Sequence, residues 1–328
     1  KFCIPGSLSS IDINELVQRF LDDVWRRPDP NREGWLRFDF RPEPARGDEG
    51  FETRFIGDLY QELDAEIRAR YALLQTPHFI SQFILEHTLL KRFEEKDFRE
   101  VTLLDPTGGS GHFYVDAFWM FVERYERASG KSRDELSSAD RAQIARTIIE
   151  KHLFGCDINP YATALARFRL TLAACDYAQP TSLRGFRDLH FNLVTIDSLI
   201  PYEKLMLGSW QAGGSLSQTF GQPEAVERAL PVLRKRHDVV VGNPPYITER
   251  DLTKRDFYRE HYESAYRAFG LSAPFTERFL QLAVEGGYVG LINSNAFARR
   301  QFGKKLIEEV LPRYDLQAVI DLSGAHIP

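Results

Sequence analysis

The stretch VTLLDPTGGSG, residues 101–111, joins a short apolar run to an acidic residue and a glycine-rich turn. The apolar run predicts a strand that is buried on both faces, and the pattern of residues 112–127 predicts a helix after the turn. Such a turn lets the backbone come close to a bound ligand, because glycine has no side chain in the way. The stretch lacks the lysine of a nucleoside-triphosphate loop, and Tyr114 stands where a dinucleotide site has its third glycine. A pyrophosphate site is therefore disfavoured.

Short apolar runs alternate with helical patterns along the rest of the chain. Further strands are predicted at residues 153–156, 191–196, 238–241, 288–292 and 317–320. Helices are predicted between them at residues 139–151, 160–174, 223–234, 272–285 and 301–311. These repeated units predict an α/β fold with an open, doubly wound and mostly parallel sheet. Ligands bind such sheets beyond the carboxyl ends of the strands.

The N-terminal part of the chain has a different pattern. Apolar residues at helical spacing predict a helix at residues 12–25, and the proline- and charge-rich residues 28–50 indicate a linker or an ordered loop. We therefore expect an N-terminal helical segment and linker over residues 1–50 and one α/β domain over residues 51–328.

Two local features lie inside the expected α/β domain. A helix is predicted at residues 59–71, and Thr76 followed by Pro77 predicts the start of another, with the threonine as its cap. Residues 208–221 are rich in Gly, Ser and Gln and are expected to form a mobile insertion.

The composition excludes several classes of protein. The chain has 328 residues, 43% hydrophobic and 27% charged, and a formal net charge of −5. Its three cysteines lack metal-ligand spacing, which excludes a disulfide framework and a zinc ribbon, and no metal site is expected. No apolar run approaches the ~20 residues of a membrane span, so a cytoplasmic protein without membrane contact is expected. Basic residues cluster at 234–237 and 299–305, which indicates either solvated helix faces or a phosphate-binding strip.

Three predicted strands are followed by a carboxylate. Asp105, after the first strand, suits a cationic amine better than phosphates, as in the amino-acid part of S-adenosylmethionine (SAM). Asp157 follows the second strand, where an acidic side chain commonly binds ribose hydroxyls, although it could instead cap the helix that starts at Asn159 or Pro160. Asp197, after the third strand, could accept a hydrogen bond from an adenine amino group or belong to a plain turn.

The strongest signal is Asn243-Pro244-Pro245-Tyr246, directly after the fourth strand. A residue before proline adopts extended conformations, so the Asn243 side-chain oxygen and the Pro244 main-chain oxygen can both face one cleft. Two acceptors aimed at one planar amine bind both of its hydrogens and turn its lone pair towards an electrophile. Tyr246 offers a flat face on which the ring bearing that amine can stack.

Together the four strand ends suit direct transfer of a methyl group from a sulfonium to an exocyclic amine. The leaving thioether is neutral, so no nucleophilic side chain or metal is needed, and in-line positioning makes ~7–11 kcal/mol available. An amine in duplex DNA must first be flipped out of the stack. The same geometry fits an RNA base or a protein glutamine amide. An inactive scaffold that keeps the SAM fold is a further hypothesis.

Five motifs resemble, in order, those of the gamma-order DNA adenine amino-methyltransferases. They are Thr76-Pro77-His78-Phe79, residues 105–111, Asp157-Ile158, Asp197-Ser198 and Asn243-Pro244-Pro245-Tyr246. The resemblance implies a Rossmann-like class I SAM-dependent methyltransferase domain that methylates N6 of adenine in double-stranded DNA. It implies that the target adenine is held by Asn243, Pro244, Pro245 and Tyr246. It implies a SAM site formed by Thr76, Asp105, Pro106, Thr107, Gly109, Gly111, Asp157, Ile158, Asp197 and Ser198.

A narrower resemblance links the chain to the PglX family of phage growth limitation and BREX anti-phage systems. It is carried by residues 71–77, 242–248, 286–290 and 302–309. It covers roughly residues 51–328 and implies a methyltransferase that marks host DNA in company with other defence proteins. Such proteins continue with a target-recognition region, so this chain is expected to be C-terminally incomplete. One departure is Gly108, where the family usually has cysteine.

Overall fold

The computed structural model describes residues 76–180, 186, 188–206 and 223–322. Four expectations fall outside the described residues: the segment at 1–50, the helices at 12–25 and 59–71, and the insertion at 208–221. Among the described residues, no helix is both long enough and apolar enough to cross a membrane.

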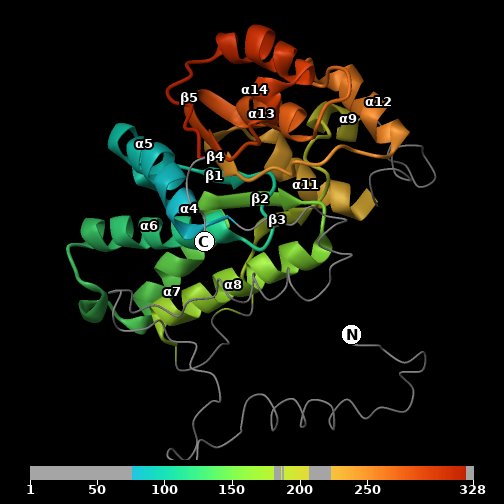
Figure 1. Ribbon diagram of the computed structural model, residues 1–328. Helices are drawn as coiled ribbons and strands as arrows, with labels where there is room; N and C mark the ends of the chain where they lie inside the picture. The colour runs from blue at the N-terminus through green and yellow to red at the C-terminus, as the bar shows by residue number, and fades with distance from the viewer. Residues whose placement is uncertain (1–75, 181–185, 187, 207–222, 323–328) are drawn as a thin grey trace, which may run out of the picture. The chain divides into compact units, whose positions relative to one another are not determined.

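Five strands form one sheet in the order β3-β2-β1-β4-β5 (Figure 1). They are β1 Leu103–Asp105, β2 Leu153–Asp157, β3 Asn192–Thr195, β4 His237–Gly242 and β5 Ala283–Leu291. Every neighbouring pair is parallel, which confirms the doubly wound sheet expected from the sequence. The strand order reverses at β1, whose neighbours are β2 and β4. Open α/β sheets bind ligands at such a reversal.

Helices cover both faces of the sheet, which lies between the two layers in Figure 1. One layer consists of α4 His78–Leu85, α5 Lys91–Glu95, α6 His112–Ser129, α7 Ser138–Thr147 and α8 Pro160–Ala178. The other contains α11 Pro223–Arg234, α12 Leu252–His261 and α13 Ser272–Leu282. Shorter elements are α9 Tyr202–Met206, α14 Ala296–Arg299 and the helical turns η9 Gln301–Gly303 and η10 Leu306–Val310.

Successive strand side chains point to opposite faces, so two hydrophobic clusters form. Leu103 of β1 packs with Val239 and Val241 of β4 against the layer that contains α4 to α8. Leu104 and Val240, the intervening residues, pack in the other cluster with α11, α12 and α13. Burial on both faces is the reason that the strands are continuous apolar runs instead of alternating ones.

Two predicted elements differ from the structure. Residues 317–320, expected as a sixth strand, are not in a strand, and Val319 is 74% exposed. Strand propensity does not suffice without a hydrogen-bonded neighbour, and none of the described strands pairs with this segment. The helix expected over 272–285 ends with α13, because Ala283 already pairs with His237 as the first residue of β5.

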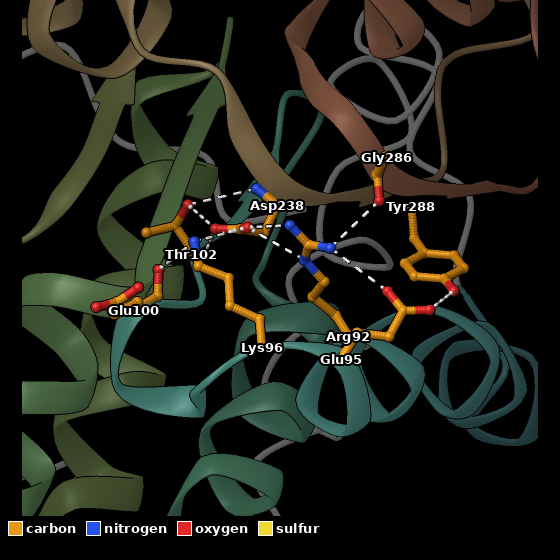
Figure 2. A network of polar contacts seen from close by, with 8 residues as sticks. All are labelled: Arg92, Glu95, Lys96, Glu100, Thr102, Asp238, Gly286 and Tyr288. Carbon is orange, nitrogen blue, oxygen red and sulfur yellow. Dashed lines mark hydrogen bonds and ion pairs between the residues drawn. The ribbon is translucent and has the colours of Figure 1, made fainter.

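A polar network holds α5 to the amino-terminal end of the sheet, away from the strand ends that carry the expected site (Figure 2). Asp238 of β4 accepts hydrogen bonds from Arg92 Nη2 and Lys96 Nζ, both at 2.9 Å, and from the Thr102 main-chain N–H at 3.1 Å. Burial alone would raise the pKa of Asp238. The hydrogen bonds from Lys96, Arg92 and Thr102 outweigh it, and the pKa lies below its ordinary value of 3.8.

Asp238→Asn should destabilise the fold by about 3 kcal/mol at pH 7, because it removes the buried carboxylate that pairs with Arg92 and Lys96. A carboxylate whose pKa is lowered on folding stabilises above its unfolded pKa and loses that contribution as the pH falls through the folded pKa. The difference between variant and wild type should therefore shrink below pH ~4. Urea unfolding at pH 7 and pH 3 measures it. Asp256→Asn, which breaks an exposed ion pair with Arg259, is the control and should change little.

Candidate functional site

A cavity of about 400 Å³ lies at the carboxyl ends of the strands, where β1 and β4 meet. Sites for small molecules usually have volumes of roughly 300–1,000 Å³. The expected site residues that line it are Thr76, Asp105, Pro106, Thr107, Gly109, Asp157, Ile158, Asp197, Ser198, Asn243 and Pro245. Asp105 and Pro245, 140 positions apart in sequence, share one cavity because parallel strands end at the same edge of the sheet, and Thr76 joins them from the start of α4.

The Asp105 carboxylate lies at the base of the glycine-rich turn and is only 2% exposed. Its Oδ1 accepts hydrogen bonds from the Thr107 main-chain N–H at 2.8 Å and from the Thr107 hydroxyl at 3.1 Å. Burial raises the pKa of Asp105 to about 8, although these hydrogen bonds oppose the rise. The carboxyl group is therefore expensive to ionise, and a cationic ligand beside it would lower its pKa again.

Tyr114 fills the space below the glycine-rich turn. Its hydroxyl donates to the Asp105 carbonyl at 3.0 Å. A Cβ at position 108 would lie 2.1 Å from that hydroxyl oxygen, so Gly108 leaves room for the tyrosine. The departure from cysteine at this position therefore accompanies a bulky side chain underneath the turn.

Asp157 connects the end of β2 to the glycine-rich turn. Its Oδ2 accepts from the Gly109 main-chain N–H at 2.8 Å, and its Oδ1 accepts from the Asn159 main-chain N–H at 2.7 Å. Asn159 itself caps α8 by accepting from the Tyr161 N–H, so Asp157 is not the cap. Burial raises the pKa of Asp157 to about 6. Ile158 beside it is 47% exposed and lines the cavity.

Asp197, after β3, is held by a side chain from α12. The Tyr258 hydroxyl donates to its Oδ2 at 2.5 Å, and the Leu199 main-chain N–H donates to its Oδ1 at 3.1 Å. Burial raises the pKa of Asp197, with Lys254 of α12 acting in the opposite direction. The neighbouring Ser198 donates its hydroxyl to the Pro106 carbonyl at 2.6 Å and so ties the third strand end to the first.

The Asn243 side chain makes a hydrogen bond at each end of its amide. Its Nδ2 donates to the Thr76 hydroxyl at 3.2 Å, and its Oδ1 accepts from the Tyr246 hydroxyl at 2.5 Å. Burial raises the pKa of Tyr246, so its phenol remains a donor at neutral pH. The cap expected from Thr76 is absent: α4 has Pro77 at its N-cap position and no side-chain cap, because the threonine hydroxyl bonds to Asn243 instead.

Three expected site residues do not line the cavity. Gly111 has a φ of 89° and turns the chain into α6, close against Ala166. Pro244 is buried, and Tyr246 is half-buried and contacts Asn243 through its hydroxyl. These three residues therefore adjoin residues that line the cavity without lining it themselves.

Sequence reasoning missed a second group of lining residues. They are His112, Phe113, Ile196, Leu199, Ile247, Glu249, Lys254, Tyr258, Leu271 and Phe275. Ile247 and Glu249 could have been found from the sequence, because they follow the Asn-Pro-Pro-Tyr segment closely. The Tyr258 contact with Asp197, however, joins residues 61 positions apart and carries no local signal.

The basic clusters singled out in the sequence do not line the cavity either. The first ends in His237, which is fully buried in β4. In the second, Lys304 and Lys305 form ion pairs with Glu308 and Glu309, one helical turn further on.

Comparison with known proteins bears on this arrangement. The family model described as "Eco57I restriction-modification methylase" matches residues 151–327, more than half of the chain. The chain belongs to the Eco57I restriction-modification methylase family. The match begins just before β2 and includes the carboxylates at the ends of β2 and β3 and the Asn-Pro-Pro-Tyr segment after β4.

The PglX resemblance is confirmed by sequence similarity. The chain is 38% identical over 98% of its length to the adenine-specific methyltransferase PglX of Streptomyces coelicolor, and it covers 27% of that protein. It is 26% identical over 71% of its length to the type II restriction enzyme and methyltransferase RM.Eco57I of Escherichia coli, covering 24% of it. The chain thus spans about a quarter of the length of each of these two relatives.

A solved structure agrees with the fold. The cryoEM structure of a DrdV–DNA complex superposes with a TM-score of 0.54 at 20% sequence identity. The match covers 80% of this chain and 24% of the DrdV chain. Together with the strand order, this likeness confirms the class I methyltransferase fold expected for an Eco57I-type methylase.

Gly242→Ala should destabilise the protein by about 1–3 kcal/mol, because the added Cβ would lie 2.5 Å from Asp105 Oδ1 and 2.7 Å from Thr107 Oγ1. Urea unfolding of the variant measures the loss. Gly270→Ala is the matched control, since the nearest atom to its added Cβ is 3.7 Å away. Equal stability of the two variants would contradict the close approach of β4 and the turn after β1.

Proposed function

We propose that this domain transfers a methyl group from SAM to the N6 amine of adenine in DNA. The observation that carries the proposal is that one cavity joins Asn243, the amine acceptor, to three carboxylates at neighbouring strand ends. Asp105 and Asp197 are buried, Asp157 is partly buried, and burial raises the pKa of all three. Membership of a restriction-modification methylase family supports the same reaction.

The cavity suits SAM in charge. Asp105 and Asp157 are costly to ionise when buried, and a ligand with a sulfonium and an ammonium group supplies the positive charge that favours their ionised forms. In the proposed arrangement Asp105 binds near the amino-acid part, Asp157 accepts hydrogen bonds from the ribose hydroxyls, and Asp197 accepts one from the adenine amine. Tyr258 and the Leu199 N–H hold the Asp197 carboxylate in place for that role.

When bound, SAM supplies an electrophilic methyl group on a positively charged sulfur. Asn243 Oδ1 and the Pro244 carbonyl accept the two hydrogens of the target amine and direct its lone pair at the methyl carbon. To do so, Asn243 must exchange its hydrogen bond from the Tyr246 hydroxyl for one from the amine. This exchange frees Tyr246 to stack on the flipped base.

The reaction balances without a further reactant. The nitrogen lone pair forms the new N–C bond while the C–S bond breaks, and the electron pair of that bond stays on the sulfur as a neutral thioether. The methylated nitrogen is briefly cationic and passes one proton to water. The hydrogen bonds that the amine donates to Asn243 Oδ1 and to the Pro244 carbonyl strengthen as the nitrogen becomes positive, which stabilises the transition state.

We further propose double-stranded DNA as the substrate, with the target base flipped out. PglX of Streptomyces coelicolor is named an adenine-specific methyltransferase, as is BrxX of Escherichia coli O9:H4, which is 28% identical over 38% of this chain. These names, and the resemblance to phage growth limitation and BREX proteins, support a role in marking host DNA beside other defence proteins. A cytoplasmic location follows from that role.

Mapping of modified bases tests the substrate. DNA, RNA and protein from cells that express the complete protein should show N6-methyladenine in DNA at one recurring sequence, and cells that express Asn243→Ala should lack it. Methyl groups found only in RNA or on glutamine amides would show that the substrate is another amine. Absence of both methylation and SAM binding would favour the inactive scaffold.

Asn243→Ala should lower methylation by roughly 10²–10³-fold or more, because one of the two acceptors for the target amine is lost. The dissociation constant for SAM, measured by calorimetry, should stay within about twofold, since the three carboxylates remain. Asn192→Ala, an asparagine of β3 outside the cavity, is the control and should keep its methylation rate. Unchanged methylation in Asn243→Ala would remove this residue from the reaction.

Asp157→Ala should weaken SAM binding by about 10–100-fold at pH 7.5, as expected for the loss of hydrogen bonds to a charged acceptor. The pKa of Asp157 is raised to about 6, so the wild-type carboxylate becomes protonated as the pH falls from 7 to 5. The gap in SAM affinity between the two proteins should therefore narrow over this range. Asp176→Ala, a half-buried carboxylate of α8 outside the cavity, should bind SAM normally.

A further inference from the structure

The hydrogen bond between Thr76 and Asn243 joins two residues that are far apart in the sequence. Thr76 precedes α4 and is 6% exposed, whereas Asn243 follows β4, 167 positions later. The sequence resemblance assigns Thr76 to the SAM site. In the structure, the Thr76 hydroxyl accepts a hydrogen bond from Asn243 Nδ2 at 3.2 Å.

An asparagine amide has a donor end and an acceptor end, and a half-turn about its last bond exchanges them. Only one orientation can serve the proposed reaction, because the target amine needs an acceptor from Asn243. With Nδ2 on Thr76, Oδ1 is turned to the other side, where it accepts from the Tyr246 hydroxyl at 2.5 Å. The hydrogen bond from the Tyr246 hydroxyl thus shows the direction in which Asn243 Oδ1 points.

We propose that Thr76 is a positioning residue that holds the Asn243 amide with its oxygen turned towards the target amine. The inference rests on the proposed function and adds a role for a residue outside the Asn-Pro-Pro-Tyr segment. When the amine binds Oδ1, the amide hydrogens on Nδ2 need an acceptor on the opposite side, and the Thr76 hydroxyl provides it. Without this acceptor the productive orientation loses a part-buried hydrogen bond, which is unfavourable.

The location of Thr76 makes a second role testable in the same experiment. Thr76 lines the cavity together with Asp105 and Thr107, so a direct contact with SAM is the competing explanation. A cofactor contact affects the binding of SAM. An orienting contact affects the turnover of bound SAM and leaves its affinity unchanged.

Thr76→Val and Thr76→Ser in the complete protein separate these roles. Valine keeps the shape of threonine but cannot accept a hydrogen bond, whereas serine keeps the hydroxyl. The substrate is genomic DNA from a strain without adenine methylation, and methyl incorporation is measured at saturating SAM and at varied SAM. SAM affinity is measured separately by calorimetry without DNA, which also shows that the variant is folded.

We expect Thr76→Val to lower kcat about tenfold to thirtyfold, with the SAM dissociation constant within about twofold of wild type. Thr76→Ser should recover most of the rate. A second variant pair uses Asn243→Asp, whose two carboxylate oxygens are both acceptors: adding Thr76→Val to it should cause a smaller loss than in the asparagine background.

Three results would overturn the inference. Thr76→Val could raise the SAM dissociation constant at unchanged kcat, which would make Thr76 a cofactor contact. Thr76→Ser could lose as much rate as Thr76→Val, or Thr76→Val could match the wild type, either of which would remove the hydroxyl from the reaction. If Thr76→Val does not fold, Thr76→Ala and Thr76→Ser are compared in the same way. Failure of the proposed function is distinct, because it appears as absent DNA methylation in the wild type.

Discussion

The site depends on how closely the carboxyl ends of β1 and β4 approach each other. Asp105 Oδ1 and Thr107 Oγ1 occupy the space into which any side chain at position 242 would project, so glycine is required there. This contact places the glycine-rich turn and the Asn-Pro-Pro-Tyr segment on one cavity, at the reversal of the strand order. In the proposed function this contact brings a cofactor on one element and an amine on the other within reacting distance.

Three carboxylates with raised pKa values line the cavity, and two of them are held by groups of the loops themselves. Asp105 is bonded by Thr107, Asp157 by Gly109 and Asn159, and these bonds only partly offset the cost of burial. A cation bound beside these carboxyl groups would therefore favour their ionised forms. The Asp238 network at the opposite end of the sheet differs, because its own cations already pair with the carboxylate.

The Asn243 amide is hydrogen-bonded by two neighbouring hydroxyl groups. Tyr246 donates to its oxygen, while Thr76 accepts from its nitrogen. In the proposed reaction the first contact is exchanged for one from the target amine, whereas the second persists. The Asn243 side chain thus has a hydrogen bond at each end of its amide, as expected for a part-buried polar group.

Much of the fold and the identity of the site residues were predictable from the sequence, because they depend on local patterns. Apolar runs buried on both faces, a glycine-rich turn after Leu104 and paired prolines after Asn243 each constrain their own few residues. Long-range contacts were not predictable in this way. Three features depend on which distant neighbour is present. The Thr76 hydroxyl bonds to Asn243 and does not cap a helix, Tyr258 holds Asp197, and residues 317–320 do not pair as a strand. Only the folded chain decides these, since a hydrogen bond or a strand requires a partner that the local sequence does not contain.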